Sequence, residues 1–244
     1  MAVRGIDVSK HNGAVNFEQV KAAGIDFVII RAGYGRLISQ KDPKFEENYA
    51  KAKAAGLNVG VYWYSYAVTV EEAETEAKVF LQTIAGKQFE YPVFLDLEEK
   101  KQFTTGKTNV TAMVDRFCSV VQAAGYYVGV YMSRSQLLSY VEKGVRDKYC
   151  IWCAEWNDKC NYPDEIGIWQ YTDSGTISGI STRVDMDIAY VDFPKMMKTL
   201  GKNGYVKTGG KVRVYVDFEE ADIDKAMEFV RICKAMKAVK IKIK

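Results

Sequence analysis

Short β-rich runs alternate with segments of helical period over most of the chain, and this alternation limits the fold more than any other feature. Three of the helical segments end in the same tripeptide, "AAG", whose glycine favours a helix C-terminus. Strict alternation predicts parallel strands, and about eight strands within roughly 190 residues predict a closed barrel. The predicted strands are residues 5–9, 26–33, 59–66, 91–98, 126–133, 150–156, 167–171 and 184–191.

Helical segments lie between the first five strands, whereas short links without a clear helical period join the later ones. The predicted fold is therefore α/β, an irregular TIM-like (β/α) barrel. A hydrophobic content of 48% is enough to bury the core of one substantial domain, which we expect at residues 1–198, with a small module at 199–244. The predicted helices are residues 17–24, 43–56, 70–86 and 108–125.

Charge and cysteine content exclude several classes of function. The net charge is +3 with both signs well mixed, so we expect no nucleic-acid partner, and no apolar run approaches the ~20 residues of a membrane span. The five cysteines are an odd number, and "CIWCAEWNDKC" has no fourth cysteine or nearby histidine to complete a zinc site. We expect no metal and no cofactor. His11 is the only histidine, and a loop role is favoured over a catalytic one, so the chemistry is expected from carboxylates.

The stretch "YPVFLDLEEKKQF" ends a predicted strand with Asp96 and Glu98 on one face, ~6.6 Å apart along the backbone. Because reactive groups gather at the carboxyl ends of barrel strands, Asp7 and Asp185 are expected at the same cleft. Like charges there raise at least one carboxyl pKa, as a general acid for glycoside hydrolysis requires. A structural alternative is equally supported: Asp96 pairs with Arg31, and Glu98 begins a solvated loop.

Further strand-end residues are candidates for contact with a substrate. Aromatic rings there can stack on sugar faces, although ordinary core packing is the alternative and is preferred for Trp63, Trp152 and Trp169. The candidate substrate-binding residues are Arg31, Tyr62, Tyr64, Tyr131, Glu155, Trp156, Gln170, Tyr171 and Asp187.

Four motifs, in order, resemble those of the glycoside hydrolase family 25 lysozymes, the N-acetylmuramidases of phage endolysins and bacterial autolysins. They are "GIDVSKHNGAVNFEQVKAAGIDFVIIRAGYG", "YPVFLDLE", "WCAEW" and "GIWQYTDSGTISGISTRVDMDIAY", and the resemblance covers about residues 3–193. It implies an irregular α/β barrel that cleaves the β-1,4 bond between N-acetylmuramic acid and N-acetylglucosamine in bacterial peptidoglycan.

The resemblance also implies roles for the carboxylates. The family's D-x-E falls on Asp96 and Glu98, with Glu98 as general acid/base and Asp96 stabilising the attacking N-acetyl group in a substrate-assisted retaining mechanism. A direct nucleophilic role for Asp96 is the older interpretation. Asp7 and Asp185 hold the network and bind the sugar. Asp187 departs from the Asn that family members often have, and it adds a negative charge beside Asp185.

Residues 199–244 differ from the rest of the chain in charge. After Leu200 the sequence has 11 basic and 6 acidic residues, against 23 and 25 in residues 1–200. "VRVYVDF", an amphipathic helical segment and "VKIKIK" predict a small βαβ-like appendage. Binding to anionic wall polymers is the first hypothesis for it, and self-association into a homo-oligomer is the second, although alternating lysines also protect edge strands.

Two classes of function remain open for the whole chain. The first is the muramidase, and the second is a catalytically silent glycan-binding barrel with the same cleft. A chitin-degrading enzyme is disfavoured because the D-x-x-D-x-D-x-E run is missing. The start, "MAVRGIDVSKHNG", lacks a signal-peptide core. We expect action on the bacterial cell wall, either outside the cell or after release of a phage protein from its host.

Overall fold

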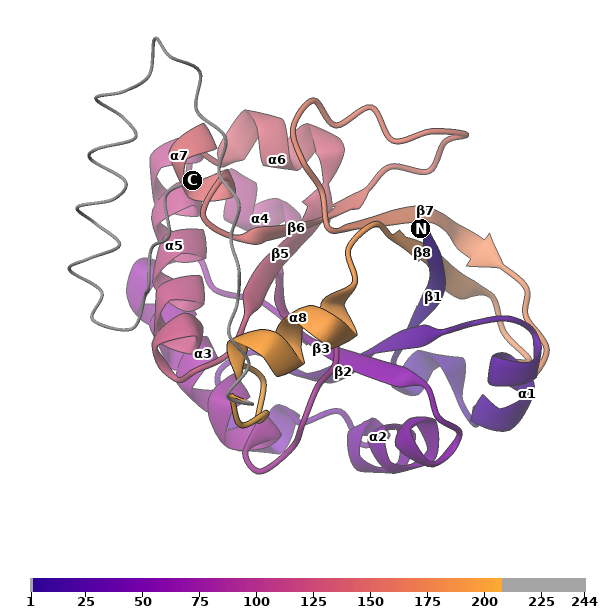
Figure 1. The fold of residues 1–244 in the computed structure, drawn as a ribbon. Coiled ribbons are helices and arrows are strands. Elements are labelled where there is room, and N and C mark those ends of the chain that lie inside the picture. The colour runs from indigo at the N-terminus through magenta and orange to yellow at the C-terminus, as the bar shows by residue number, and fades with distance from the viewer. Residues whose placement is uncertain (1, 208–244) are drawn as a thin grey trace, which may run out of the picture. The chain divides into compact units, whose positions relative to one another are not determined.

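Eight strands close into a single barrel in the order of the sequence (Figure 1). The computed structural model describes residues 2–207. All eight strands lie where the alternation predicts them, and the predicted barrel is confirmed. The strands are β1 (Val3–Val8), β2 (Phe27–Tyr34), β3 (Asn58–Tyr64), β4 (Val93–Asp96), β5 (Val128–Ser133), β6 (Cys150–Ala154), β7 (Ile168–Gly175) and β8 (Val184–Ala189).

The last strand runs against the others. Strands β1 to β7 pair in parallel, whereas β8 pairs antiparallel with both β7 and β1. The expectation of parallel strands was therefore wrong for β8. Residues 176–183 form a short link without a helix, and parallel strands need a longer crossover. The amino end of β8 consequently lies at the rim formed by the carboxyl ends of the other strands.

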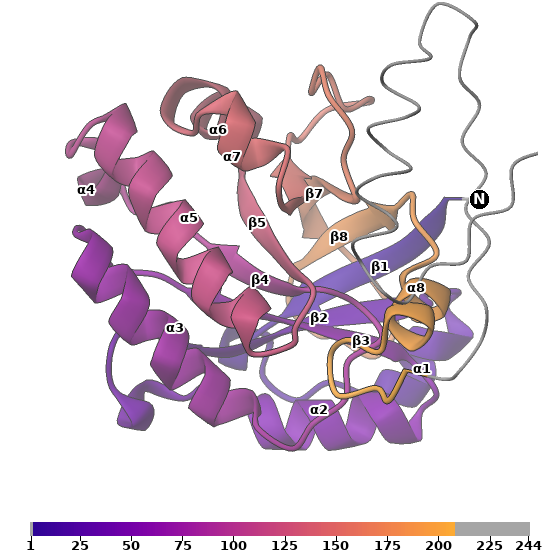
Figure 2. The same cartoon turned by 60° about the vertical axis from the view of Figure 1, so that its left-hand side comes forward.

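Helices cover the outside of the barrel, and side-chain caps mark where some of them begin. Asn16 and Thr69 cap α1 and α3, because their side-chain oxygens accept the first free backbone N–H groups. Figure 2 shows α3 and α5 side by side, and Phe80 stacks on Phe117 between them. The helices are α1 (Phe17–Ala22), α2 (Phe45–Ala54), α3 (Val70–Ile84), α4 (Lys100–Phe103), α5 (Lys107–Ala123), α6 (Arg134–Tyr140), α7 (Lys143–Arg146) and α8 (Phe193–Leu200), with 3-10 turns η1 (Lys10–Asn12) and η2 (Ile38–Gln40).

The second half of the barrel is irregular, as predicted. Residues 155–167, between β6 and β7, contain no helix. The core has two layers, one between the strands and the helices and one inside the barrel. Trp63 belongs to the first layer and Trp152 to the second, and both are at most 1% exposed. Three cysteines (Cys118, Cys150 and Cys153) are buried, and Cys160 is half-buried.

Residues 201–207 follow α8 and lie against the barrel end opposite the rim formed by the carboxyl ends of the parallel strands. The buried Asn203 adopts φ 56°, donates to the Tyr91 carbonyl at 2.7 Å and accepts from the Tyr127 backbone N–H at 2.7 Å. The rest of the predicted C-terminal module, including "VRVYVDF" and "VKIKIK", lies outside the described residues. No helix within residues 2–207 has the length and apolar character needed to cross a membrane.

Candidate active site

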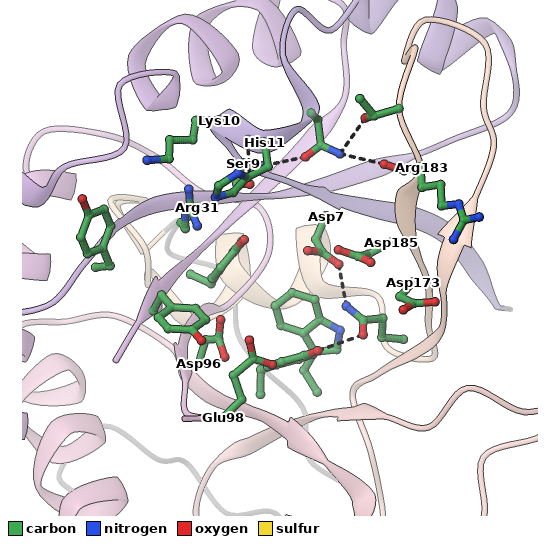
Figure 3. Close-up of a pocket in the computed structure, with 18 of the residues that line it drawn as sticks. Asp7, Ser9, Lys10, His11, Arg31, Asp96, Glu98, Asp173, Arg183 and Asp185 are labelled. Atoms are coloured by element: carbon green, nitrogen blue, oxygen red, sulfur yellow. Dashed lines mark hydrogen bonds between the residues drawn. The ribbon is translucent and has the colours of Figure 1, made fainter. Parts of the chain in front are cut away.

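A pocket of about 750 Å³ opens at the rim where the carboxyl ends of the parallel strands meet the amino end of β8 (Figure 3). The structure brings nine of the thirteen predicted site residues to its wall. They are Asp7, Arg31, Tyr62, Tyr64, Asp96, Glu98, Tyr131, Gln170 and Asp185.

One group of carboxylates lies where β1 meets β8. Asp7 and Asp185 are direct partners in the antiparallel register, and Figure 3 shows them next to each other with Asp173 beyond. Gln170 of β7 donates from Nε2 to Asp7 Oδ2 at 2.8 Å. The Gln170 Oε1 atom accepts from the Tyr131 hydroxyl at 2.9 Å, which fixes the amide so that its NH₂ faces Asp7.

The second group follows β4. Asp96 is the last residue of this strand and is buried, and one of its oxygens, Oδ1, has no hydrogen-bond partner within residues 2–207. Glu98 lies two residues further on, exposed at the pocket mouth. Tyr64 at the end of β3 pairs with Asp96 in register and donates from its hydroxyl to Glu99 at 2.7 Å. A buried carboxyl group and a solvent-accessible one therefore share one wall.

Arg31 does not pair with Asp96, so the structural alternative for this carboxylate was wrong. Its Nε donates to Asp42 Oδ2 at 2.7 Å in a buried ion pair, and Asp42 also accepts from the backbone N–H groups of Lys10 and Lys44. Asp42 lies in the loop after β2, outside any predicted strand, so the strand pattern could not predict that it pairs with Arg31. The positive charge of Arg31 still lies close enough to Asp96 to favour its ionised form.

Burial and mutual repulsion raise the pKa of every carboxyl group at the pocket that was predicted to be catalytic. Burial raises the pKa of Asp96 well above its usual range, and the charge of Glu98 adds to the rise. Burial also raises the pKa of Asp7 well above its usual range, and the charge of Asp185 adds to that rise. For Asp185, burial raises the pKa to about 6. Burial by surrounding protein also raises the pKa of Glu98, despite its exposed position at the mouth, while the nearby Tyr64 hydroxyl opposes the rise.

Four predicted substrate-binding residues lie off the pocket wall. Asp187 is fully buried deeper in the barrel, where its Oδ1 accepts from Trp152 Nε1 at 2.8 Å, because β8 runs inward from the rim. Glu155 accepts from the backbone and side chain of Asn161 and so ties its own loop. Trp156 is 60% exposed and donates to Gln170 at 3.2 Å, and Tyr171 lies against Met186.

Ten further residues line the pocket that the sequence did not single out as site residues. Trp152 was expected in the core and is buried there, yet it also forms part of the pocket lining. His11 was treated as a loop residue. Tyr34 is the last residue of β2, so its place at a strand end could have identified it as a candidate. The loop residues have no periodic pattern that could have identified them. The ten are Ser9, Lys10, His11, Asn12, Tyr34, Tyr66, Trp152, Asp173, Thr182 and Arg183.

The arrangement suits acid–base chemistry on a neutral polar ligand. It offers a protonatable carboxyl group at an open mouth, an adjacent buried carboxyl, and aromatic walls. Basic side chains of Lys10, His11 and Arg31 lie on a different side of the pocket from Glu98 in Figure 3. Within residues 2–207, no three His, Cys, Asp or Glu side chains are grouped so as to hold a metal ion.

Known proteins share this fold and are similar to this chain in sequence. The autolytic lysozyme of Clostridium acetobutylicum is 30% identical over 188 residues, covering 76% of this chain and 55% of that protein. The modular autolysin LytC of Streptococcus pneumoniae, solved with a synthetic peptidoglycan ligand, is 28% identical with a TM-score of 0.68, over 78% of this chain and 47% of that one. The CTP1L endolysin is 28% identical with a TM-score of 0.70, over 80% and 69% of the two chains.

The chain spans about half the length of the first two of these relatives. The family model described as "Glycosyl hydrolases family 25" matches residues 6–180, which is most of the chain and includes the end of β1 and all of β2 to β7. With the closed barrel and the carboxylate-lined pocket, this match leads to one conclusion. The chain belongs to glycosyl hydrolase family 25.

Proposed function

We propose that the protein is a peptidoglycan hydrolase that cleaves the β-1,4 bond between N-acetylmuramic acid and N-acetylglucosamine. One observation carries the proposal: Glu98, with a raised pKa, lies at the open mouth of the pocket beside the buried Asp96. A raised pKa keeps a carboxyl group protonated at a pH where ordinary carboxyl groups have lost their proton, as a general acid needs. The lysozymes and autolysins to which the chain is similar support the choice of substrate.

In the proposed reaction Glu98 protonates the leaving glycosidic oxygen. The oxygen of the substrate's own N-acetyl group attacks the anomeric carbon as the glycosidic bond breaks, and Asp96 orients that group and stabilises the positive charge that develops on it. Water then attacks the anomeric carbon and gives a proton to the Glu98 carboxylate, so the configuration is retained. The Arg31 charge favours ionised Asp96 during these steps.

Asp7 and Asp185 have a supporting role in this proposal. Burial raises the pKa of both groups, which favours their protonated forms, and a protonated carboxyl group can donate as well as accept hydrogen bonds to sugar hydroxyls. Gln170 keeps Asp7 in place. Tyr62 and Tyr131 line the pocket and are proposed to contact an apolar sugar face.

A catalytically silent glycan-binding barrel is the alternative, since the same walls can hold a sugar without cleaving it. The pairing of Asp96 with Glu98 favours the enzyme, because binding alone needs no costly carboxylate cluster. The test is digestion of purified peptidoglycan, followed by borohydride reduction and mass spectrometry of the products. New reducing ends on muramic acid that the wild type produces and Glu98→Gln does not would support the proposal. Glu18→Gln, a change on the exposed face of α1, is the matched control and should cleave like the wild type. Binding without cleavage supports the silent barrel.

The C-terminal residues 199–244 are proposed to bind anionic wall polymers, on the basis of their basic excess. Action on the bacterial wall follows from the substrate. Sedimentation with cell walls, with and without the residues after Lys207, tests the wall-binding proposal. A loss of sedimentation on truncation supports it. A change from dimer to monomer on truncation, with wall binding unchanged, supports self-association.

A further inference from the structure

A buried carboxylate outside the pocket holds the turn that follows β3. Residues 65–67 form this turn, and Tyr66 within it is 49% exposed and lines the pocket. Glu76 of α3 is completely buried behind the turn. Its Oε2 accepts from the Ser65 hydroxyl at 2.5 Å, and its Oε1 accepts from the Tyr66 backbone N–H at 2.9 Å. Burial of a carboxyl group destabilises the folded state unless hydrogen bonds offset the loss of hydration. The two bonds of Glu76 therefore indicate a specific role for this side chain.

Gln102 of α4 connects the same turn to the segment that carries Glu98. Its Nε2 donates to the Ser65 carbonyl, the Ser65 hydroxyl and the Ala67 carbonyl at 3.0–3.2 Å. Its Oε1 accepts from the Glu99 backbone N–H at 2.9 Å. Gln102 is itself fully buried. The backbone one residue beyond Glu98 is thus fixed by a side chain that the turn holds.

The hydrogen bonds in this cluster run in one direction. The Ser65 hydroxyl accepts from Gln102 Nε2 and from the Ala67 backbone N–H at 3.2 Å, so its single hydrogen points to Glu76. Glu76 also receives the Tyr66 N–H, and it is therefore the final acceptor of the whole chain of bonds. A glutamine at position 76 has one acceptor oxygen for these two donors, and its NH₂ would oppose one of them.

We propose that Glu76 is a positioning residue for glycoside hydrolysis, which acts through Ser65 and Gln102 to hold the backbone beside Glu98 and the ring of Tyr66 in the pocket wall. The inference rests on the proposed function of the pocket. Ser65 adds a direct link, since its backbone N–H donates to the Asp96 carbonyl at 2.8 Å. Burial raises the pKa of Glu76 to about 7, against its hydrogen bonds, so kinetics are best compared at pH 8, where it is ionised.

The kinetic test compares Glu76→Gln and Ser65→Ala with Glu74→Gln. Glu74 lies on the same helix but pairs with Arg116 and Lys78 away from the turn, so it is a matched control. We expect kcat to fall about 10- to 100-fold in Glu76→Gln, as small misplacements of catalytic groups do, with KM changed less than about threefold. The double variant should lose less than the two single losses multiplied, because both changes break one chain of bonds.

Hydrogen exchange provides a readout that does not need activity. Amides in peptides covering residues 65–68 and 97–103 should exchange faster in Glu76→Gln than in wild type. Their exchange rates in Glu74→Gln should equal those of the wild type. If the wild type cleaves glycan and Glu76→Gln keeps its kcat, or if exchange at 97–103 is unchanged, the positioning role is wrong. If the wild type does not cleave but the exchange result holds, the proposed function fails and the structural coupling stands. Should Glu76→Gln not fold, Ser65→Ala alone decides, since it removes only a hydroxyl group.

Discussion

Asp42 provides the sharpest test of the electrostatic structure around the pocket. Its Oδ2 accepts from Arg31 Nε at 2.7 Å and from the Lys10 backbone N–H at 3.1 Å, and its Oδ1 accepts from the Lys44 backbone N–H at 2.9 Å. The two side chains of the ion pair are 10% and 1% exposed. Asp42→Asn can keep the bond to Lys44, but its NH₂ would face two donors. The guanidinium would then be buried without its counter-charge.

Removing one partner of a buried ion pair costs about 3–5 kcal/mol, and this is the expected loss in free energy of unfolding for Asp42→Asn. The assay is urea denaturation followed by tryptophan fluorescence, with the denaturant slope checked for constancy. Asp26→Asn breaks the exposed pair with Lys21 and should cost less than about 1 kcal/mol. A loss below about 1 kcal/mol for Asp42→Asn would refute the reasoning. Adding Arg31→Leu should recover part of the loss, because the uncompensated charge is then gone.

Two further predictions concern the barrel. Burial raises the folded-state pKa of Asp187 well above its unfolded value of about 4, so its ionisation penalises the folded state as pH rises from about 4 towards the folded pKa. Asp187→Asn should therefore flatten the fall in unfolding free energy over this range in urea titrations, while an unchanged slope would show that Asp187 does not cause it. Phe80 is fully buried between α3 and α5, and Phe80→Ala should cost about 3–5 kcal/mol by leaving a cavity; a thermal midpoint equal to wild type would contradict this packing.

The strand pattern predicted the strand-end residues of the pocket rim because a strand end has a fixed place in a barrel. Once the strands were assigned correctly, the barrel alone placed Asp7, Asp96 and Gln170 at one pocket. The direction of β8 left no such signal, since alternation does not distinguish a parallel strand from an antiparallel one. Asp185 and Asp187 share a face, but the reversed strand takes Asp187 down into the barrel and leaves Asp185 at the rim.

Other parts of the site depend on contacts that no local pattern encodes. Asp42 lies in a loop 11 residues after Arg31, and Lys10 reaches the pocket through η1. Glu76 sits in an amphipathic helix among other glutamates, and only the fold shows that it points inward while Glu74 points outward. Long-range hydrogen bonds of this kind are fixed by tertiary packing, so sequence reasoning finds them only after the elements are placed.

The central claim is that Glu98 is the acid of a working hydrolase. The most direct test is the rate at which Glu98→Gln releases reducing ends from purified peptidoglycan, measured beside sedimentation binding to the same material. A glutamine keeps the size and hydrogen bonding of the side chain but cannot transfer the proton, and general acid catalysis contributes about 10²- to 10⁴-fold. We predict a loss of that size with binding retained. Release at the wild-type rate would contradict the account.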